Sequence, residues 1–144
     1  MGDMKRKAVR PRVVGQTKDA GFEIGVRKTF SVSPGQAWDL ITSEAGLKLW
    51  LGDAAGFRLE KGQPYQTREG AEGEVRVVNP GEHFRLTWRP KDWPKASTIQ
   101  VRLIPSGGKT VISFHQEQLL GQKQREQMHR RWQKVLEELQ ALLD

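Results

Sequence analysis

The chain contains no cysteine and no long apolar run. Without cysteine, disulfides, thiolate metal sites and cysteine nucleophiles are all excluded. No stretch approaches the roughly 18 apolar residues that a membrane-spanning helix needs. No apolar segment follows the positive charges near the N-terminus, so a secretion signal is not indicated either. We therefore expect a cytoplasmic protein that does not enter a membrane.

Motifs for catalysis and for metal or nucleotide binding are also missing. The three histidines, His83, His115 and His129, show neither HExxH nor HxH spacing, so we predict no metal site. There is no GxGxxG or GxxxxGKS sequence, and no Ser/His/Asp set stands in a known motif context. We therefore assign no cofactor and no catalytic residue. His115 shares a strand face with Ser113 and Glu117, which favours a surface histidine, with a polar group in a pocket as the alternative.

Positive charge is concentrated at the N-terminus. Residues 1–20 carry six basic and two acidic residues, which gives +4 of the total net charge of +7. A basic arm can bind phosphates, but no aromatic residue is interleaved with these charges and no reader motif follows. We therefore do not expect nucleic acid as a partner. We interpret residues 1–20 as a disordered basic arm and residues 21–144 as one domain.

The last 24 residues have the pattern of an amphipathic helix. If all of 121–144 is helical, it is roughly 36 Å long at about 1.5 Å per residue. Its apolar stripe must lie on another apolar surface, because leaving it in water would be too costly. The stripe consists of Met128, Trp132, Val135, Leu136, Leu139, Leu142 and Leu143.

The preceding residues predict short strands and two short helices. Ser33, Pro34 and Gln36 form a capping-box pattern that ends the first strand and starts a helix, and Gly52 is a good helix terminator. Alternating apolar residues separated by turn sequences indicate a one-faced antiparallel sheet. The expected strands are 22–32, 57–60, 65–68, 72–79, 82–88, 97–104 and 110–119, and the expected short helices are 34–42 and 44–51.

Three segments resemble one known family. AWDLITSEAGLKLWLG looks like its helix pair, EGEVRVVNPGEHFRLTW like its strand hairpin, and RRWQKVLEELQALL like its closing helix. They are similar to the activator of heat-shock protein 90 ATPase homologue-like family, in the superfamily of START domains, birch-pollen-allergen-like proteins and polyketide cyclases. The resemblance covers residues 22–144. It departs from the family at Arg131, where glycine is more common.

The resemblance implies an α+β helix-grip fold. In this fold a curved antiparallel sheet of about seven strands wraps round the long C-terminal helix, with two short helices after the first strand and a cavity between the long helix and the sheet. Fold alone does not fix function, since members of the superfamily include carriers, cyclases and co-chaperone domains.

The aromatic residues suggest what such a cavity would bind. Most of them have the positions of core residues, and the same positions would line a ligand cavity. We expect a monomeric binding protein that holds an apolar or aromatic small molecule, or a module that docks on a partner protein such as a chaperone. The alternative is a cyclase-like enzyme that uses the same cavity. The expected ligand-binding residues are Trp50, Phe57, Tyr65, Trp88, Phe114, Gln116, Met128 and Trp132.

The acidic residues Glu69, Glu72 and Glu74 could be mistaken for paired catalytic carboxylates. No apolar residues surround them in the sequence to raise a pKa. We interpret them as the solvated end of a hairpin.

Overall fold

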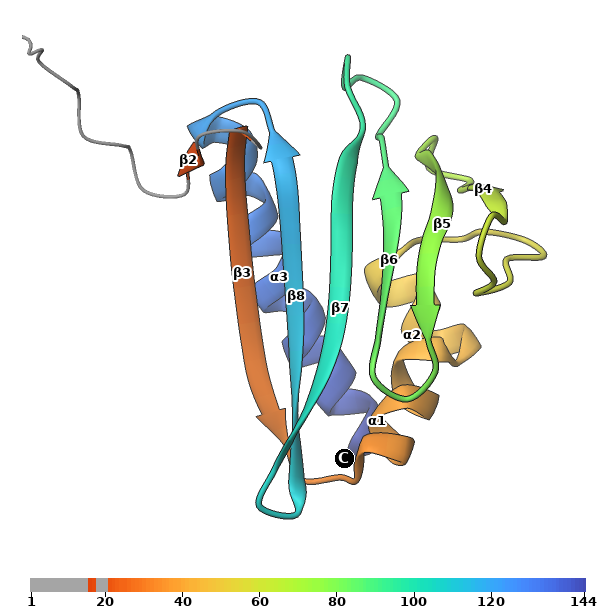
Figure 1. The fold of residues 1–144 in the computed structure, drawn as a ribbon, viewed down its shortest axis with the longest axis vertical. Coiled ribbons are helices and arrows are strands. Elements are labelled where there is room, and N and C mark those ends of the chain that lie inside the picture. The colour runs from red at the N-terminus through yellow and green to blue at the C-terminus, as the bar shows by residue number, and fades with distance from the viewer. Residues whose placement is uncertain (1–15, 18–20) are drawn as a thin grey trace, which may run out of the picture.

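The computed structural model describes residues 16–17 and 21–144 (Figure 1). The prediction of a disordered arm over 1–20 lies outside the described residues, apart from the two residues of the first strand. In chain order the elements are β2 (Gln16–Thr17), β3 (Gly21–Phe30), α1 (Pro34–Thr42), α2 (Glu44–Trp50), β4 (Pro64–Gln66), β5 (Glu72–Asn79), β6 (His83–Trp88), β7 (Ser97–Ser106), β8 (Lys109–Leu119) and α3 (Gln122–Leu143).

The strands form one antiparallel sheet in the order β2-β3-β8-β7-β6-β5-β4. From β4 to β8 each strand pairs with the next along the chain, and β3 closes the sheet against β8. The glycine residues in the turns explain how the strands can be connected tightly. Between β7 and β8, Gly107 and Gly108 have φ values of 55° and 83°, the left-handed conformation that two-residue hairpin turns require. The predicted fold class is confirmed.

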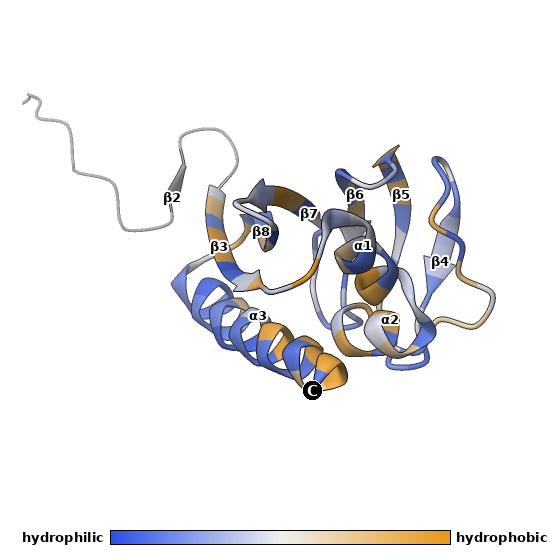
Figure 2. Cartoon of the chain, turned by 90° about the horizontal axis from the view of Figure 1, so that it is seen from below, coloured by the Kyte–Doolittle hydropathy of each residue, from blue (hydrophilic) through white to orange (hydrophobic). Residues whose placement is uncertain are grey.

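All three helices lie on the concave side of the curved sheet (Figure 2). Along α3 the predicted stripe is buried at Met128, Trp132, Val135, Leu136 and Leu139. The prediction was wrong for the last two positions of the stripe, since Leu142 and Leu143 are 47% and 40% exposed. No helix within the described residues has the length and apolar character needed to cross a membrane.

Local signals set the ends of the two short helices. The Ser33 hydroxyl accepts a hydrogen bond from the Gln36 backbone N–H at 3.2 Å, and the Gln36 side chain accepts one from the Ser33 N–H at 2.9 Å. This is the predicted capping box, and it fixes the start of α1. Gly52 has φ of 118° directly after the end of α2. It provides the left-handed residue that allows the chain to leave the helix.

One predicted strand is absent. Residues 57–60 are irregular instead of forming a strand, because their backbone groups bond locally. Phe57 N–H donates to the Ala54 carbonyl at 3.1 Å, and Glu60 N–H donates to the Arg58 carbonyl at 2.9 Å. The alternation of Phe57 and Leu59 is typical of a strand, but an irregular segment can also pack both side chains against the core, as this one does.

Candidate functional site

The space between α3 and the sheet is filled by a continuous set of aromatic rings, which we call the aromatic seam: Trp50, Phe84, Phe114 and Trp132. Trp132 stacks on Phe114, with ring centroids 4.7 Å apart and planes tilted by 15°. Trp50 contacts Phe114 at 6.2 Å and Phe84 at 5.2 Å. All four side chains are fully buried. The seam is thus packed with protein side chains at the place where the family resemblance implies a cavity.

Six of the eight predicted ligand-binding residues meet at or beside this seam. Met128 is buried on α3 one turn before Trp132, while Trp88 and Gln116 come from β6 and β8. Gln116 links α3 to β7 through two hydrogen bonds. Trp132 Nε1–H donates to its Oε1 at 2.9 Å, and its Nε2–H donates to Ser97 Oγ at 2.9 Å. The Ser97 hydroxyl in turn donates to the Trp88 carbonyl at 2.8 Å. This buried chain satisfies the polar groups and fixes α3 to the sheet.

The other two predicted residues, Phe57 and Tyr65, lie near β4, the strand at the edge of the sheet farthest from β2. Their rings contact each other edge to face at 5.6 Å. The Tyr65 hydroxyl donates to the Thr87 carbonyl at 2.5 Å, and burial raises the pKa of Tyr65 above its ordinary value. Tyr65 also lines a surface hollow of about 640 Å³, whose remaining lining is mostly polar, with Glu72, Arg89 and their neighbours.

Arg131 covers one end of the seam. Its guanidinium lies over the rings of Trp88 and Trp132, at 5.1 Å and 5.4 Å from their centroids. Its Nη2 donates to the Trp50 carbonyl at 2.9 Å. Burial lowers the pKa of Arg131, and the nearby negative charge of Glu69 opposes this shift. Sequence reasoning noted Arg131 only as a departure from the family pattern, yet an arginine within an aromatic stripe is a recognisable signal for a cation–π contact.

Two buried hydrogen-bond donors at this position have no partner. They are Nε1 of Trp88, a residue only 5% exposed, and Nε of Arg131. An unpaired buried N–H costs free energy, so such groups are uncommon in folded proteins. The end of the seam is therefore suited to receive an acceptor oxygen, such as a carbonyl or a carboxylate.

Glu69 belongs to a turn and is solvent-exposed. Hydrogen bonds from the backbone N–H groups of Glu69 itself and of Asp53 lower its pKa, with a smaller contribution from Arg131. The Asp53 bond is 3.1 Å long. Through this bond the Glu69 carboxylate holds the turn after α2, from a solvated position as the sequence predicted.

An apolar groove of about 340 Å³ opens on the surface where the helix pair meets β5. Trp38 on α1 and Leu47 on α2 form one side, while Val78 on β5 lies on the other. These side chains are only partly buried, although they pack against the core. We call this the apolar groove, and its full lining is Trp38, Thr42, Leu47, Phe57, Leu59, Val78 and Pro80.

Within the described part of the chain, one group of side chains has donor atoms close enough to share a metal ion: Glu23, His115 and Glu117. It lies away from the seam and the groove, on the outer face of the sheet. His115 is therefore a surface histidine on the face of Glu117, as the strand pattern favoured.

Comparison with known proteins agrees with this geometry. The sequence profile of the family described as "Activator of Hsp90 ATPase homolog 1-like protein" matches residues 31–144. No curated protein matches the chain. Similar solved structures include CalU16 from Micromonospora echinospora, with 18% identity, a TM-score of 0.71, and coverage of 84% of this chain and 76% of that one.

Two further structures are described by chaperone-related names. An HSP90 activator from Plasmodium falciparum has 19% identity and a TM-score of 0.70, covering 85% of this chain and 96% of that chain. The Aha1 dimer from Colwellia psychrerythraea has 20% identity and a TM-score of 0.68, covering 82% and 92% respectively. At these identities the likeness establishes the fold alone.

Proposed function

The chain belongs to the family of activator of Hsp90 ATPase homolog 1-like proteins, and on this premise we propose that it is a non-enzymatic binding module that docks on an Hsp90-type chaperone through the apolar groove. The proposal rests on a difference in packing between the aromatic seam and the apolar groove. The aromatic seam is filled by buried side chains, whereas the apolar groove is open and lined by partly exposed apolar ones.

The groove has the character of a protein-docking site. Its lining brings together Trp38 and Phe57, and large aromatic residues dominate the binding energy of protein interfaces. Its volume of about 340 Å³ lies at the lower end of the range for small-molecule sites. An open groove of this size suits one or two apolar side chains of a partner, surrounded by a polar rim.

Two neighbouring valines allow a matched test. Val78 lines the groove, while Val77 is 38% exposed and pairs with Arg85, one residue along in the ladder. Successive strand residues point to opposite faces, so Val78→Thr changes the groove and Val77→Thr changes the outer face. Binding to the Hsp90 of the same host is measured by calorimetry, and the effect on its ATPase rate is measured in parallel.

We expect Val78→Thr to weaken binding about tenfold, which corresponds to roughly 1.4 kcal/mol, while Val77→Thr binds like the parent. Leu59→Ser, in the loop that lines the groove, gives a second groove variant with little risk to the sheet. Thermal melts of all variants verify folding. Absence of binding by the parent, or equal losses from the two valine variants, would refute docking through the groove.

A second candidate function rests on the unpaired donors beside Arg131. They favour a small aromatic molecule bearing a carbonyl or carboxylate, which would enter the end of the seam as the Arg131 side chain moves aside. Covering about 200 Å² of apolar surface would contribute about 5 kcal/mol before association costs, so we expect micromolar to millimolar affinity.

Tryptophan fluorescence titrated with benzoate and naphthoate tests this second candidate, and native mass spectrometry of protein from its own host searches for a bound molecule. Arg131→Gln should abolish the response, whereas Arg130→Gln at the exposed neighbouring position should retain it. A response that is the same in both variants would exclude this site.

The enzymatic alternative, a cyclase-like activity, has less support. General acid–base catalysis is most effective when the pKa of the group lies near the working pH. Tyr65 has a raised pKa and Glu69 a lowered one, so both shifts lead away from neutral pH. Neither residue therefore has a pKa shifted toward the value that proton transfer at neutral pH favours.

A further inference from the structure

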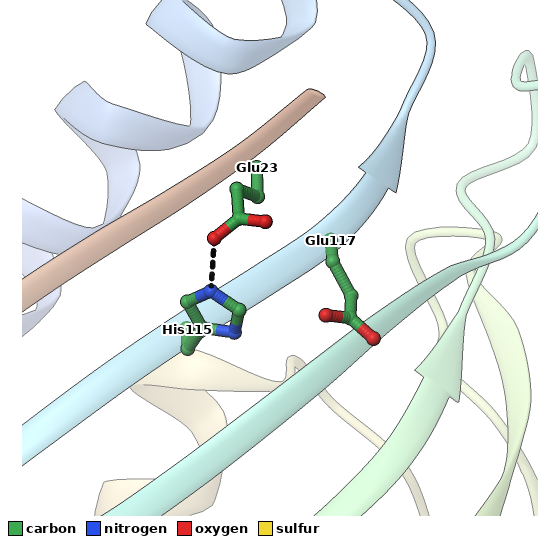
Figure 3. Close-up of side chains that lie close together, drawn as sticks. All are labelled: Glu23, His115 and Glu117. Atoms are coloured by element: carbon green, nitrogen blue, oxygen red, sulfur yellow. Dashed lines mark hydrogen bonds and ion pairs between the residues drawn. The ribbon is translucent and has the colours of Figure 1, made fainter. Parts of the chain in front are cut away.

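The outer face of the sheet carries a compact group of one imidazole and two carboxylates (Figure 3). Glu23 belongs to β3, and His115 and Glu117 belong to the neighbouring strand β8. His115 and Glu117 are two residues apart, so both point to the same face of the strand. No metal motif is recognisable in the sequence, because 92 residues separate Glu23 from His115.

The distances match what a small metal ion requires. His115 Nε2 lies 3.0 Å from Glu23 Oε1, and one donor atom from each of the three residues lies within 4.8 Å of the others. Zinc bonds to nitrogen and oxygen are about 2.0–2.2 Å long, so neighbouring ligands in a tetrahedral site lie roughly 3.4 Å apart. The 3.0 Å between Glu23 and His115 is within about 0.4 Å of this spacing. Glu117 needs a shift of at most about 1.5 Å to reach this spacing, which rotation of a flexible glutamate side chain can provide.

A β-bulge lies at one end of this group. Between the pairs Phe22–Leu119 and Ile24–Gln116, β8 has two residues, Glu117 and Gln118, opposite the single residue Glu23. Gln118 takes a left-handed φ of 68°. Glu117 shares the outer face with His115 by ordinary alternation, and the extra residue after it shifts the alternation so that Leu119 returns to the core. Bulges of this kind redirect side chains next to functional sites.

Gln118 itself does not belong to the group. Its Oε1 accepts a hydrogen bond from Thr98 Oγ1 at 2.8 Å, which holds its side chain toward β7. The Gln118 amide is thus directed away from the three donor residues.

The two carboxylates have no lysine or arginine partner within the described residues. Glu23 has an ion-pair contact only with His115, and Arg125 bonds the backbone carbonyl of Glu23 and not its carboxylate. Across the sheet, the residues paired with His115 are Gly25 and Gln100, which are both neutral. Two negative charges close together without a cation are unfavourable, and a bound cation would relieve their repulsion.

We propose that Glu23, His115 and Glu117 bind one Zn²⁺ ion, with water in the fourth position. An imidazole nitrogen and two carboxylate oxygens are ligands that zinc accepts, and three protein ligands with one open position are typical of accessible zinc sites. His115 and Glu23 have side chains 35% and 34% exposed, so the ion can enter from solvent. The site is independent of the apolar groove and of the seam.

Calorimetric titration of ZnCl₂ into the full chain, free of any affinity tag and treated with chelator, tests the proposal. We expect one ion per chain with micromolar affinity, and a rise in Tm on adding Zn²⁺. His115→Gln should abolish both effects, and Glu117→Gln should weaken binding at least tenfold. His83→Gln and His129→Gln are the matched controls, since both lie outside the group, and they should bind like the parent.

Nuclear magnetic resonance separates loss of the site from loss of the fold. Without zinc, the spectrum of His115→Gln should match that of the parent outside β3 and β8. In the parent, Zn²⁺ should shift the imidazole signals of His115 and leave those of His83 and His129 in place. A stoichiometry near zero, or binding that survives His115→Gln and Glu117→Gln, would overturn the assignment.

Discussion

Replacing Trp132 tests how α3 is held on the sheet. The indole is fully buried, stacks on Phe114 and donates a hydrogen bond to Gln116. Truncation of a buried tryptophan to alanine costs about 3–5 kcal/mol. In addition, Gln116 Oε1 loses its donor, and an unsatisfied buried acceptor costs about 1–3 kcal/mol more. Trp132→Ala should therefore lower the free energy of unfolding by about 4–8 kcal/mol, much of a typical total of about 5–15 kcal/mol.

Trp132→Phe separates the two contributions. It keeps an aromatic ring against Phe114 but removes the N–H that bonds Gln116, so we expect a loss nearer 1–3 kcal/mol. Trp93→Ala is the control, since this ring is only partly buried beside Trp88 and should cost much less. Urea melts followed by far-UV circular dichroism give the free energies without depending on tryptophan fluorescence. If the melts of Trp132→Ala and the parent coincide, α3 does not dock through this residue and the packing argument fails.

Three further predictions concern single positions. Burial raises the pKa of Tyr65, the only tyrosine in the chain, so its contribution to stability is present below its ordinary pKa of about 10 and lost as the pH rises above that value. Alkaline melts of the parent should therefore show tyrosinate absorbance appearing together with unfolding, and tyrosinate forming in the folded protein near pH 10 would contradict this. Gly73→Ala should destabilise by about 1–3 kcal/mol or more, because its Cβ would meet the Thr87 carbonyl oxygen; Gly121→Ala, with open space around its Cβ, should melt close to the parent. Ser33→Ala removes the capping box and should cost about 1 kcal/mol in a denaturant melt, whereas equal stability of the two would show that the cap contributes little.

The sequence by itself determined the elements whose signals are local. The 3.6-residue period identified α3 and its buried side from Met128 to Leu139, and the Ser33–Gln36 pattern identified the start of α1. Such signals depend on residues a few positions apart, so they can be read without knowing the fold. The same reasoning failed for residues 57–60, because alternating apolar residues in an irregular segment produce the same pattern as a strand.

The tertiary structure alone decided how the candidate sites are composed. Periodicity placed Trp132 and Phe114 inside, but only their stacking shows that the seam is packed. Arg131 covers that seam because α3 brings it over Trp88, which is 43 positions away in the chain and on another element. His115 meets Glu23 because β3 pairs with β8, and the bulge at Gln118 adjusts which side chains point outward. These contacts join distant segments, and strand register and long-range packing leave no periodic signal in the sequence.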